Sequence, residues 1–321
     1  HITNEIKSRL FRDYSSDDTK IAIVEIGGTV GDIESQPFLE ALRQFQHEVG
    51  KENAIFLHVT LIPYLKSSGE MKTKPTQASV KELQGMGIQP DIIVCRSEYP
   101  LDNGIKDKIA LFCNVPSSHV LQNLDVEYLY EAPLAMEEEH LAQVACECLG
   151  LPCPEPNLSD WKAMCTALKH PKGEVSVALV GKYTQLHDAY ISVVESLKHG
   201  GIANGVSVNI KWVDSEKVTA ENVEEFLGDV SGIIVPGGFG DRGIEGMIQS
   251  IRYAREKKVP FLGLCLGMQL TIVEFTRDVV GYNDAHSVEF LPGTTHPVIH
   301  LMPDQEGICL LYTSPSPRDS T

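Results

Sequence analysis

A cysteine flanked by glycines is the residue of this sequence best suited to covalent chemistry. Cys265 is the centre of Gly263-Leu-Cys-Leu-Gly267, where a predicted strand gives way to a predicted helix. Glycines on either side of a nucleophile remove the Cβ clashes of such a tight turn. The turn then holds the sulfur at the carboxyl edge of the sheet, near a helix N-terminus that favours the thiolate. A buried, inert cysteine is the alternative, but the paired glycines favour a nucleophile.

A glycine-rich run follows the preceding predicted strand. Pro236-Gly-Gly-Phe-Gly240 allows backbone N–H groups to approach a substrate closely. Such a run can form half of an oxyanion hole, with the amide after the nucleophile as the other half. A plain tight turn is the alternative. Because ligands of open α/β sheets bind at the carboxyl ends of strands, two such loops after successive strands favour a catalytic site.

A third glycine-rich turn, in the first half of the chain, is acidic. Glu25-Ile-Gly-Gly-Thr-Val-Gly-Asp-Ile-Glu34 ends a predicted strand, and its carboxylates could hold Mg²⁺ directly or through water. It is not a Walker A loop, because Gly31 is followed by Asp32 rather than by lysine. An acidic turn without a ligand is the alternative.

The segment Glu70-Met-Lys-Thr-Lys-Pro-Thr-Gln77 has the opposite character. The chain of 321 residues has 27 basic and 44 acidic side chains, a formal charge of −17. In so acidic a chain, two lysines on a segment bounded by proline suggest a contact with a triphosphate. An ordinary solvated surface is the alternative.

Composition excludes several classes of protein. The net negative charge argues against non-specific binding to nucleic acid. No apolar run approaches the roughly 20 residues of a membrane-spanning helix, and the first residues lack a signal-peptide pattern. Eight cysteines occur without a CxxC pair, and the four within residues 146–165 lack the spacing of a zinc site. We therefore expect free thiols in a cytoplasmic protein.

Apolar runs alternate with helical patterns in both halves of the sequence. Strands are predicted at residues 21–26, 54–61, 91–95, 120–121, 175–180, 206–212, 232–235 and 259–264. Helices are predicted at residues 4–11, 36–50, 76–86, 106–112, 133–149, 188–199, 219–227 and 243–257, with Gly200-Gly201 as a helix stop. This alternation predicts an α/β fold with parallel sheets covered by helices.

Prolines mark a boundary between two domains. The pattern predicts a first domain over residues 1–150, a linker with one short helix over 151–174, and a second domain over 175–309. Residues 310–321 are rich in Ser, Pro and Thr and are expected to be a foreign or disordered tail. With a start other than Met, this composition indicates a chain truncated at both ends; a natural flexible terminus is the alternative.

Together these motifs resemble the CTP synthase family over residues 1–309. Matches to its synthetase (amidoligase) domain are Val24–Glu34, Gly69–Gln77 and Ile109–Pro116. Matches to its class I glutamine amidotransferase domain are Gly181–Thr184, Ser196–Gly201, Val235–Gly240 and Gly263–Gln269. The resemblance implies an incomplete P-loop-like parallel-sheet domain followed by an incomplete flavodoxin-like domain.

The resemblance also implies an activity. In the family, ATP phosphorylates the 4-oxygen of the uracil of UTP, and ammonia released from glutamine displaces the phosphate after passing through an internal tunnel. It further implies Mg²⁺, GTP as an allosteric activator, CTP as a feedback inhibitor, and a homotetramer that shares nucleotide sites between subunits.

Residue roles follow from the matched motifs alone. The resemblance implies that Cys265 is the catalytic residue. It assigns glutamine binding or the oxyanion hole to Gly237, Gly238, Leu266, Gly267, Met268, Gln269 and Glu289. The UTP- and CTP-binding residues are Asp32, Ile33, Glu34, Lys72, Thr73, Lys74, Pro75, Thr76, Gln77 and Lys108. Asp125 and Val126 match the adenine contact of ATP, Phe239 the GTP contact and Glu25 a Mg²⁺ ligand.

Two departures from the family pattern concern catalysis. The family's P-loop lysine and a second Mg²⁺-binding aspartate would precede His1, and the His and Glu of the Cys–His–Glu triad would follow Glu306. Without its base, Cys265 loses most of its activation, so we expect this chain to be inactive alone. Another glutamine-dependent amidoligase of the same plan, or a non-catalytic nucleotide-binding relative, remains an alternative.

Overall fold

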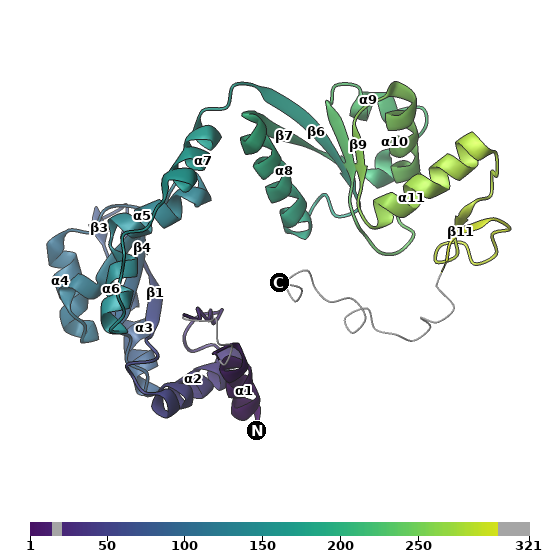
Figure 1. The fold of residues 1–321 in the computed structure, drawn as a ribbon. Coiled ribbons are helices and arrows are strands. Elements are labelled where there is room, and N and C mark those ends of the chain that lie inside the picture. Colours follow the sequence, from purple (N-terminus) through teal and green to yellow (C-terminus); the bar gives the residue numbers. More distant parts are fainter. Residues whose placement is uncertain (15–20, 301–321) are drawn as a thin grey trace. The chain divides into compact units, whose positions relative to one another are not determined.

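The chain folds as two compact units, the first ending at Cys165 and the second starting at Thr166. The structure, a computed structural model, describes residues 1–14 and 21–300 (Figure 1). The division falls inside the segment 151–174 that was predicted to be a linker. The predicted tail, residues 310–321, lies outside the described residues, as does the end of the predicted second domain at residue 309.

The first unit is built on a parallel sheet with the strand order β1-β4-β5. Its strands are β1 (Leu57–Ile62), β4 (Ile92–Ser97) and β5 (Val120–Leu124). Side chains alternate between the faces of a strand. Ile93 and Cys95 therefore pack on one face against α3 (Lys74–Gly85) and α4 (Asn103–Cys113), whereas Ile92 and Val94 pack on the other against α6 (Leu141–Cys148). The sheet is thus covered on both faces, as its sequence pattern predicts.

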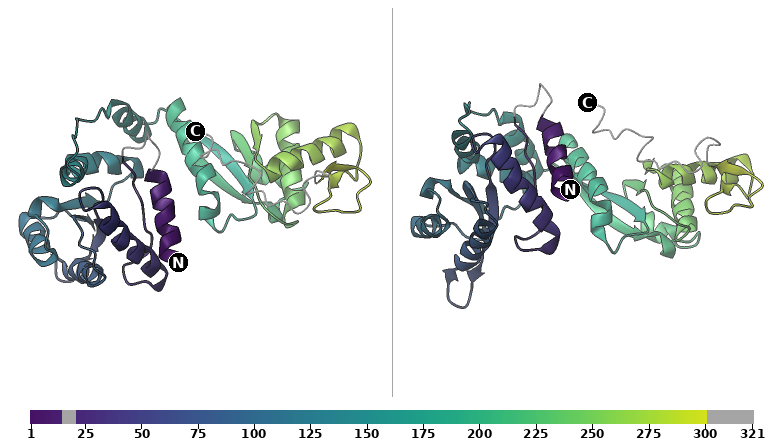
Figure 2. Two further views of the ribbon diagram at one scale, coloured as in Figure 1. Left: turned by 60° about the horizontal axis from the view of Figure 1, so that its bottom comes forward. Right: turned by 90° about the horizontal axis from the view of Figure 1, so that it is seen from below.

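Smaller elements complete the first unit. Helix α1 (Ile2–Tyr14) packs on α2 (Gln36–Val49), where the ring centroids of Phe11 and Phe45 are 4.9 Å apart (Figure 2). The other elements are β2 (Tyr64–Leu65), β3 (Glu70–Met71), α5 (Ala132–Glu138) and the 3₁₀ turns η1 (Ile33–Ser35), η2 (Ser117–His119) and η3 (Leu129–Glu131). Helix α7 (Ser159–Lys169) contains the division between the two units. Strands β2 and β3 form an antiparallel hairpin.

Two predictions for the first unit were wrong. Residues 21–26 are not a strand, and the side chain of Ile23 is 94% exposed. Among the described residues no strand pairs with this segment, and an unpaired strand leaves its backbone groups to water. The predicted helix 133–149 is two helices, because His140 adopts a left-handed φ of +59° between α5 and α6.

The second unit has a parallel sheet of order β7-β6-β8-β9. Its strands are β6 (Glu174–Gly181), β7 (Ser207–Asp214), β8 (Gly232–Val235) and β9 (Phe261–Gly263). In chain order this arrangement is 2-1-3-4, which is the flavodoxin-like order. Right-handed crossovers then place α8 (Ile191–Asn204) on one face and α9 (Val223–Leu227) and α10 (Ile244–Lys257) on the other (Figure 1).

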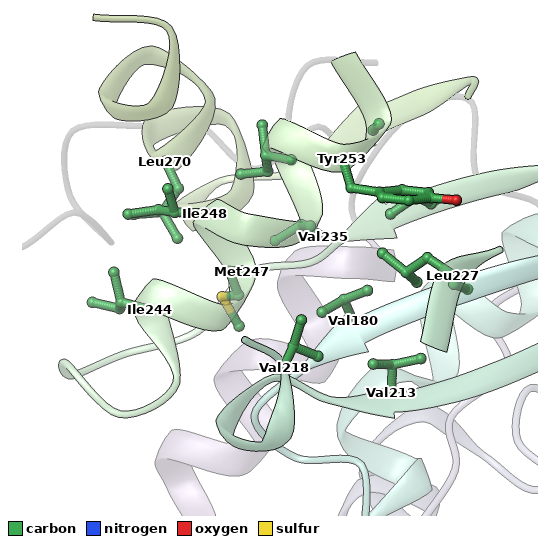
Figure 3. Packing of buried hydrophobic residues seen from close by; sticks show 14 of the residues in the cluster. Val180, Val213, Val218, Leu227, Val235, Ile244, Met247, Ile248, Tyr253 and Leu270 are labelled. Atoms are coloured by element: carbon green, nitrogen blue, oxygen red, sulfur yellow. The ribbon is translucent and has the colours of Figure 1, made fainter. Parts of the chain in front are cut away.

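The main core of the second unit lies between this sheet and α10. Ile244, Met247, Ile248 and Ile251 of α10 follow the spacing of a single helix face, and all four are buried. Figure 3 shows Met247 facing Val180 of the sheet. Helix α11 (Leu266–Phe275) also contributes to this core. It is followed by a π-helical turn (Thr276–Val280), β10 (His286–Ser287) and β11 (Pro297–Ile299). The 3₁₀ turns of this unit are η4 (His187–Tyr190) and η5 (Ser215–Lys217).

The predicted helix stop at Gly200-Gly201 was also wrong. Helix α8 continues to Asn204 and ends at Gly205, whose φ is +69°. A Cβ on Gly201 would lie 2.6 Å from the carbonyl oxygen of Val206. The glycine is therefore needed for close packing of the helix against the following strand rather than for ending the helix.

No helix within residues 1–14 and 21–300 is long and apolar enough to cross a membrane. The seven cysteines in these ranges are free thiols.

Candidate active site

Cys265 occupies a strained turn between β9 and α11. Its φ of +52° and ψ of −106° lie outside the conformations that a residue with a Cβ prefers. The amide of Leu264 donates to the carbonyl of Val235 over 2.9 Å, which ties the turn to the neighbouring strand β8. The thiol of Cys265 is exposed. The turn thus presents the sulfur to solvent at the carboxyl end of the sheet.

The glycines around Cys265 are required by close backbone contacts. A Cβ on Gly263 would lie 2.6 Å from the carbonyl carbon of Gly267. A Cβ on Gly267 would overlap the carbonyl oxygen of Val235. Both approaches are far closer than van der Waals contact, so α11 can start this close to β8 only without side chains at the two positions.

The glycine-rich run Pro236–Gly240, here named the glycine arch, lies beside the thiol. The Cβ position of Gly237 is 3.4 Å from Cβ of Cys265 and 3.9 Å from its Sγ. The ring of Phe239, the predicted GTP contact, is 86% exposed. The structure therefore brings the arch and the candidate nucleophile together, as two strand-end loops of one sheet.

The residues assigned to glutamine binding by resemblance differ in how far their side chains are exposed. The side chain of Leu266 is buried in the core, so only its backbone can face a ligand, whereas the side chain of Met268 is 53% exposed. Gln269 lies on α11, and its amide donates to the carbonyl of Cys265 over 3.1 Å. Glu289 lies farther along the chain. Burial lowers the pKa of Lys182, and the charge of Glu289 opposes that shift.

Lys182 is a site residue that the sequence reasoning did not single out. It follows β6 directly and is buried, and its Nζ donates to the carbonyl of Phe239 over 3.1 Å. Desolvation of its ammonium group is the main reason for its lowered pKa. The available signal was the position of a lysine at the carboxyl end of a predicted strand, in the quoted run Gly181–Thr184.

The predicted triphosphate segment lies at the start of α3. The amide of Lys72 donates to the carbonyl of Pro63 over 2.9 Å, which fixes the backbone after the β2–β3 hairpin. The ammonium of Lys72 contacts Glu70 and, with Lys108, holds the pKa of that carboxyl below its usual range. The structure therefore brings Lys72 and Lys108 to one carboxylate.

Other members of this segment have structural contacts. Thr76 is buried, and its hydroxyl donates to Oγ1 of Thr60 over 2.9 Å. The side-chain amide of Gln77 donates to Oγ1 of Thr73 over 3.0 Å. Nζ of Lys74, which stands directly before Pro75, lies 5.5 Å from the ring centroid of Phe112. The charges available to a ligand are thus those of Lys72 and Lys74, together with Lys108.

The acidic turn lies at the other end of α3. A carboxylate oxygen of Asp32 accepts a hydrogen bond from the amide of Thr29 over 3.0 Å, and Ile33 is 81% exposed. The Cβ position of Gly31 is 2.5 Å from Oε1 of Glu82, which is eight residues after Lys74. At the rise of an α-helix this separation is about 12 Å along the axis. The structure therefore does not bring Asp32, Ile33 and Glu34 to the lysines of the same chain.

The predicted adenine contact lies at the carboxyl ends of β4 and β5. Asp125 forms an exposed ion pair with Arg96 at 3.6 Å, and its amide donates to the carbonyl of Ser97 over 3.2 Å. Val126 is half-buried next to it. The position agrees with the strand-end rule for ligands of α/β sheets.

The residues that the structure describes do not form a magnesium site. In the described ranges no group of three or more His, Cys, Asp or Glu side chains could hold a metal. Glu25 is exposed on the unpaired segment 21–26, and the Asp32 carboxylate is already bonded within its own turn.

Comparisons with known proteins agree with both units. The family model "CTP synthase N-terminus" matches residues 1–151, and "Glutamine amidotransferase class-I" matches residues 185–316. The fold and the two matches thus place an N-terminal CTP synthase domain and a class I glutamine amidotransferase domain on one chain.

Named relatives give the family. A CTP synthase of Clostridium acetobutylicum is 58% identical over 308 residues, 96% of this chain and 58% of that protein. One of Ruminiclostridium cellulolyticum is 59% identical over the same shares of both chains. A solved structure of the glutaminase domain of Trypanosoma brucei CTPS with bound acivicin is 41% identical, covering 41% of this chain and 51% of that chain with a TM-score of 0.39. The chain belongs to the CTP synthase family, and it spans 58% of the length of the curated relatives it matches.

Proposed function

We propose that this chain takes part in the ATP-dependent amination of UTP to CTP with ammonia from glutamine, as part of a ligase that forms C–N bonds. The observation that carries this proposal is the exposed thiol of Cys265, held beside the glycine arch. It lies on the same chain as a unit matched by the N-terminal CTP synthase family model. A thiol and an arch of amides are the groups that amide hydrolysis requires.

Glutamine hydrolysis would start at the sulfur of Cys265. Its thiolate attacks the side-chain amide carbon of glutamine, and the amides of Gly238 and Leu266 stabilise the negative charge that develops on oxygen. Ammonia leaves after gaining a proton, and water then cleaves the thioester to give glutamate. The buried side chain of Leu266 fits this role, because it fixes the backbone that offers the N–H group.

The first unit would supply the nucleotide site. Lys72, Lys74 and Lys108 would bind the triphosphate of UTP, and Asp125 with Val126 would contact the adenine of ATP. ATP would phosphorylate the uracil 4-oxygen, and ammonia would then displace that phosphate. The distance along α3 between the lysines and Asp32–Glu34 supports a CTP or UTP site completed by a second subunit.

The proposal has further parts that rest on the resemblance. They are a homotetramer, a cytoplasmic location, GTP as an activator that stacks on Phe239, and inhibition by CTP. The exposed ring of Phe239 supports the GTP contact.

Labelling with a glutamine-like chloroketone tests the proposal on the full chain. We expect Cys265 to be alkylated at least tenfold faster than Cys153, the other exposed cysteine within residues 1–14 and 21–300, and glutamine to slow labelling at Cys265 but not at Cys153. A Cys153→Ser variant is the control that removes the reference thiol. Equal labelling of the two cysteines, unaffected by glutamine, would contradict the proposal.

Nucleotide binding gives a second, independent test. UTP should bind the chain more tightly than GTP does at the first unit, and Lys72→Met should weaken UTP binding at least tenfold by calorimetric titration. Lys66→Met, in the neighbouring β2–β3 hairpin loop, is the matched control and should leave UTP binding unchanged. Equal affinities of the parent and Lys72→Met chains would refute the role of Lys72.

A further inference from the structure

We propose that Lys182 is a positioning residue that holds the glycine arch in shape beside Cys265. The inference rests on the proposed function, because it concerns how the oxyanion-stabilising loop is kept ready. Nothing in the sequence motifs of the arch itself would fix it, since three glycines leave a loop many backbone conformations.

The side chain of Lys182 reaches directly to the arch. Its Nζ donates to the carbonyl oxygens of Phe239, over 3.1 Å, and of Gly240. The whole residue is only 4% exposed. Hydrogen bonds from a charged donor are roughly twice as strong as neutral ones, so two of them on adjacent carbonyls restrict the arch strongly.

The aliphatic stem of Lys182 also supports the arch from the side. The Cβ position of Gly238 lies 3.4 Å from Cδ of Lys182 and 3.5 Å from Cδ2 of Leu266. The arch is therefore enclosed between the lysine stem and the first residue of α11. Leu266 follows Cys265, so the same packing links the lysine, the arch and the thiol.

Lys182 itself is held in place at its backbone. Its amide donates to the hydroxyl of Tyr190 over 3.0 Å, and its carbonyl accepts from Nη2 of Arg242 over 3.1 Å. Tyr190 is buried, and Arg242 also pairs with Glu216 at 2.6 Å. Because its backbone is fixed at the end of β6, the side chain of Lys182 can hold the arch at a defined distance from that strand.

A third contact points toward the glutamine-binding side. Nζ of Lys182 lies 5.9 Å from the ring centroid of Phe290, the residue after Glu289. The ammonium therefore lies between the arch and the segment that carries the assigned glutamine-binding carboxylate.

Two alkylating probes separate positioning from general reactivity. A glutamine-like chloroketone is attacked at its carbonyl carbon by the Cys265 thiolate, which places a negative charge on oxygen before the thioether forms and chloride leaves. Iodoacetamide reacts with the same thiolate by direct displacement of iodide, and no oxyanion forms. The ratio of the two rate constants at Cys265 therefore reports the arch, and the iodoacetamide rate alone reports the thiol.

We expect Lys182→Met to lower this ratio at least tenfold in the full chain, while the iodoacetamide rate changes by less than threefold. Lys182→Arg, which keeps charged donors, should recover most of the ratio. Lys217→Met, an exposed lysine of the same unit, is the matched control and should leave the ratio unchanged. An unchanged ratio in Lys182→Met would overturn the proposal.

Hydrogen exchange decides the matter if Lys182→Met does not fold. In the unmodified chain, the amides of residues 237–240 should exchange at least tenfold more slowly than in an unstructured peptide, and exchange at peptide rates would overturn the role of Lys182. A chain in which the arch is protected but chloroketone shows no preference for Cys265 over Cys153 would instead refute the proposed glutamine site.

Discussion

Two segments of this chain have the same sequence signature, an apolar run followed by glycines, and only one of them becomes a strand. The run Gly232–Val235 before the glycine arch is fully buried and pairs with β6 and with β9. The run 21–26 before Gly27-Gly28 is exposed, and no described strand pairs with it. Apolar composition therefore selects a strand only where neighbours offer both hydrogen bonds and a covered face.

The same difference governs the loops that follow. Gly263 and Gly267, on either side of Cys265, closely approach backbone atoms of Gly267 and Val235, which cannot move aside as the end of a side chain can. The acidic turn around Gly27 meets only flexible carboxylates. A turn can hold a strained, defined conformation where the surroundings leave it no alternative.

The largest expected effect comes from the ion pair that joins α10 to α11. Glu274 is 1% exposed, and Arg255 donates to its Oε1 from Nε over 2.9 Å and from Nη2 over 2.8 Å. Arg255→Met leaves a buried carboxylate without its partner, so the free energy of unfolding of the second unit should fall by about 3 kcal/mol. Urea unfolding followed by Trp212 fluorescence, in a Trp161→Phe background, measures it.

Two further variants sharpen this prediction. Arg252→Met removes ion pairs to Glu256 and Asp278, neither of which is buried. Because such pairs contribute little, this variant should change the free energy of unfolding by less than about 0.5 kcal/mol. The double variant Arg255→Met/Glu274→Leu should recover much of the loss, because no charge is then left buried. A single Arg255→Met variant as stable as the parent would show that α11 is held by its apolar contacts alone.

The next effect compares a glycine beside Cys265 with a glycine of the acidic turn. Gly267→Ala places a Cβ against the carbonyl oxygen of Val235, so α11 must shift. We expect this overpacking to lower the free energy of unfolding by about 2 kcal/mol. The Cβ of Gly27→Ala meets nothing nearer than Oε1 of Glu25, at 3.7 Å. A surface substitution of this kind should change stability by less than about 0.5 kcal/mol. Equal urea midpoints for both variants and the parent would break the comparison.

The smallest expected effect concerns the covered side of β1. The ring of His58 contacts Oγ of Ser79 at 2.9 Å, and burial lowers the pKa of His58 from its ordinary value. The unfolded chain therefore takes up the proton first as pH falls through about 6.5, so the first unit should lose stability below that pH and keep it above.

Unfolding followed by Trp161 fluorescence, in a Trp212→Phe background, measures this pH dependence. The urea midpoint of the first unit should fall between pH 7.5 and pH 5.5. His58→Gln, which cannot take up the proton, should show a flatter profile over the same range. An identical slope for both chains would assign the effect to other groups.

Much of the fold followed from local sequence pattern. The run 232–235 was predicted with its observed bounds, and α10 was predicted from one residue before its start. The α/β class and the parallel sheets followed from the alternation of elements. In each of these elements the local preference and the tertiary surroundings agree.

The sequence pattern could not show which segments of the chain lie next to one another in the fold. Residues 21–26 have the composition of a strand, but composition says nothing about whether a neighbouring strand is present. Gly201 lies inside α8 because Val206 approaches it closely, and the left-handed conformation of His140 ends α5 in a run that reads as one helix. Lys182 was missed for the same reason, since its importance lies in which carbonyls it reaches.

For the candidate site, too, only the local features could be predicted from the sequence. The turn chemistry around Cys265 was readable from spacing, because glycines are needed wherever backbones touch. The separation of Asp32–Glu34 from Lys72–Lys74 along α3 could not be predicted from the sequence. Two motifs assigned to the same ligand do not reveal whether they meet within one chain or across two.

The backbone conformation of Cys265 sets stability against function at this position. Its φ of +52° suits a residue without a side chain, so a Cys265→Gly chain should withstand denaturant at least as well as the parent while losing its sulfur. A screen that selects variants for stability alone would therefore favour replacement of Cys265 by glycine. The packing of the rest of the second unit must therefore offset the backbone strain of a residue with a Cβ at this position.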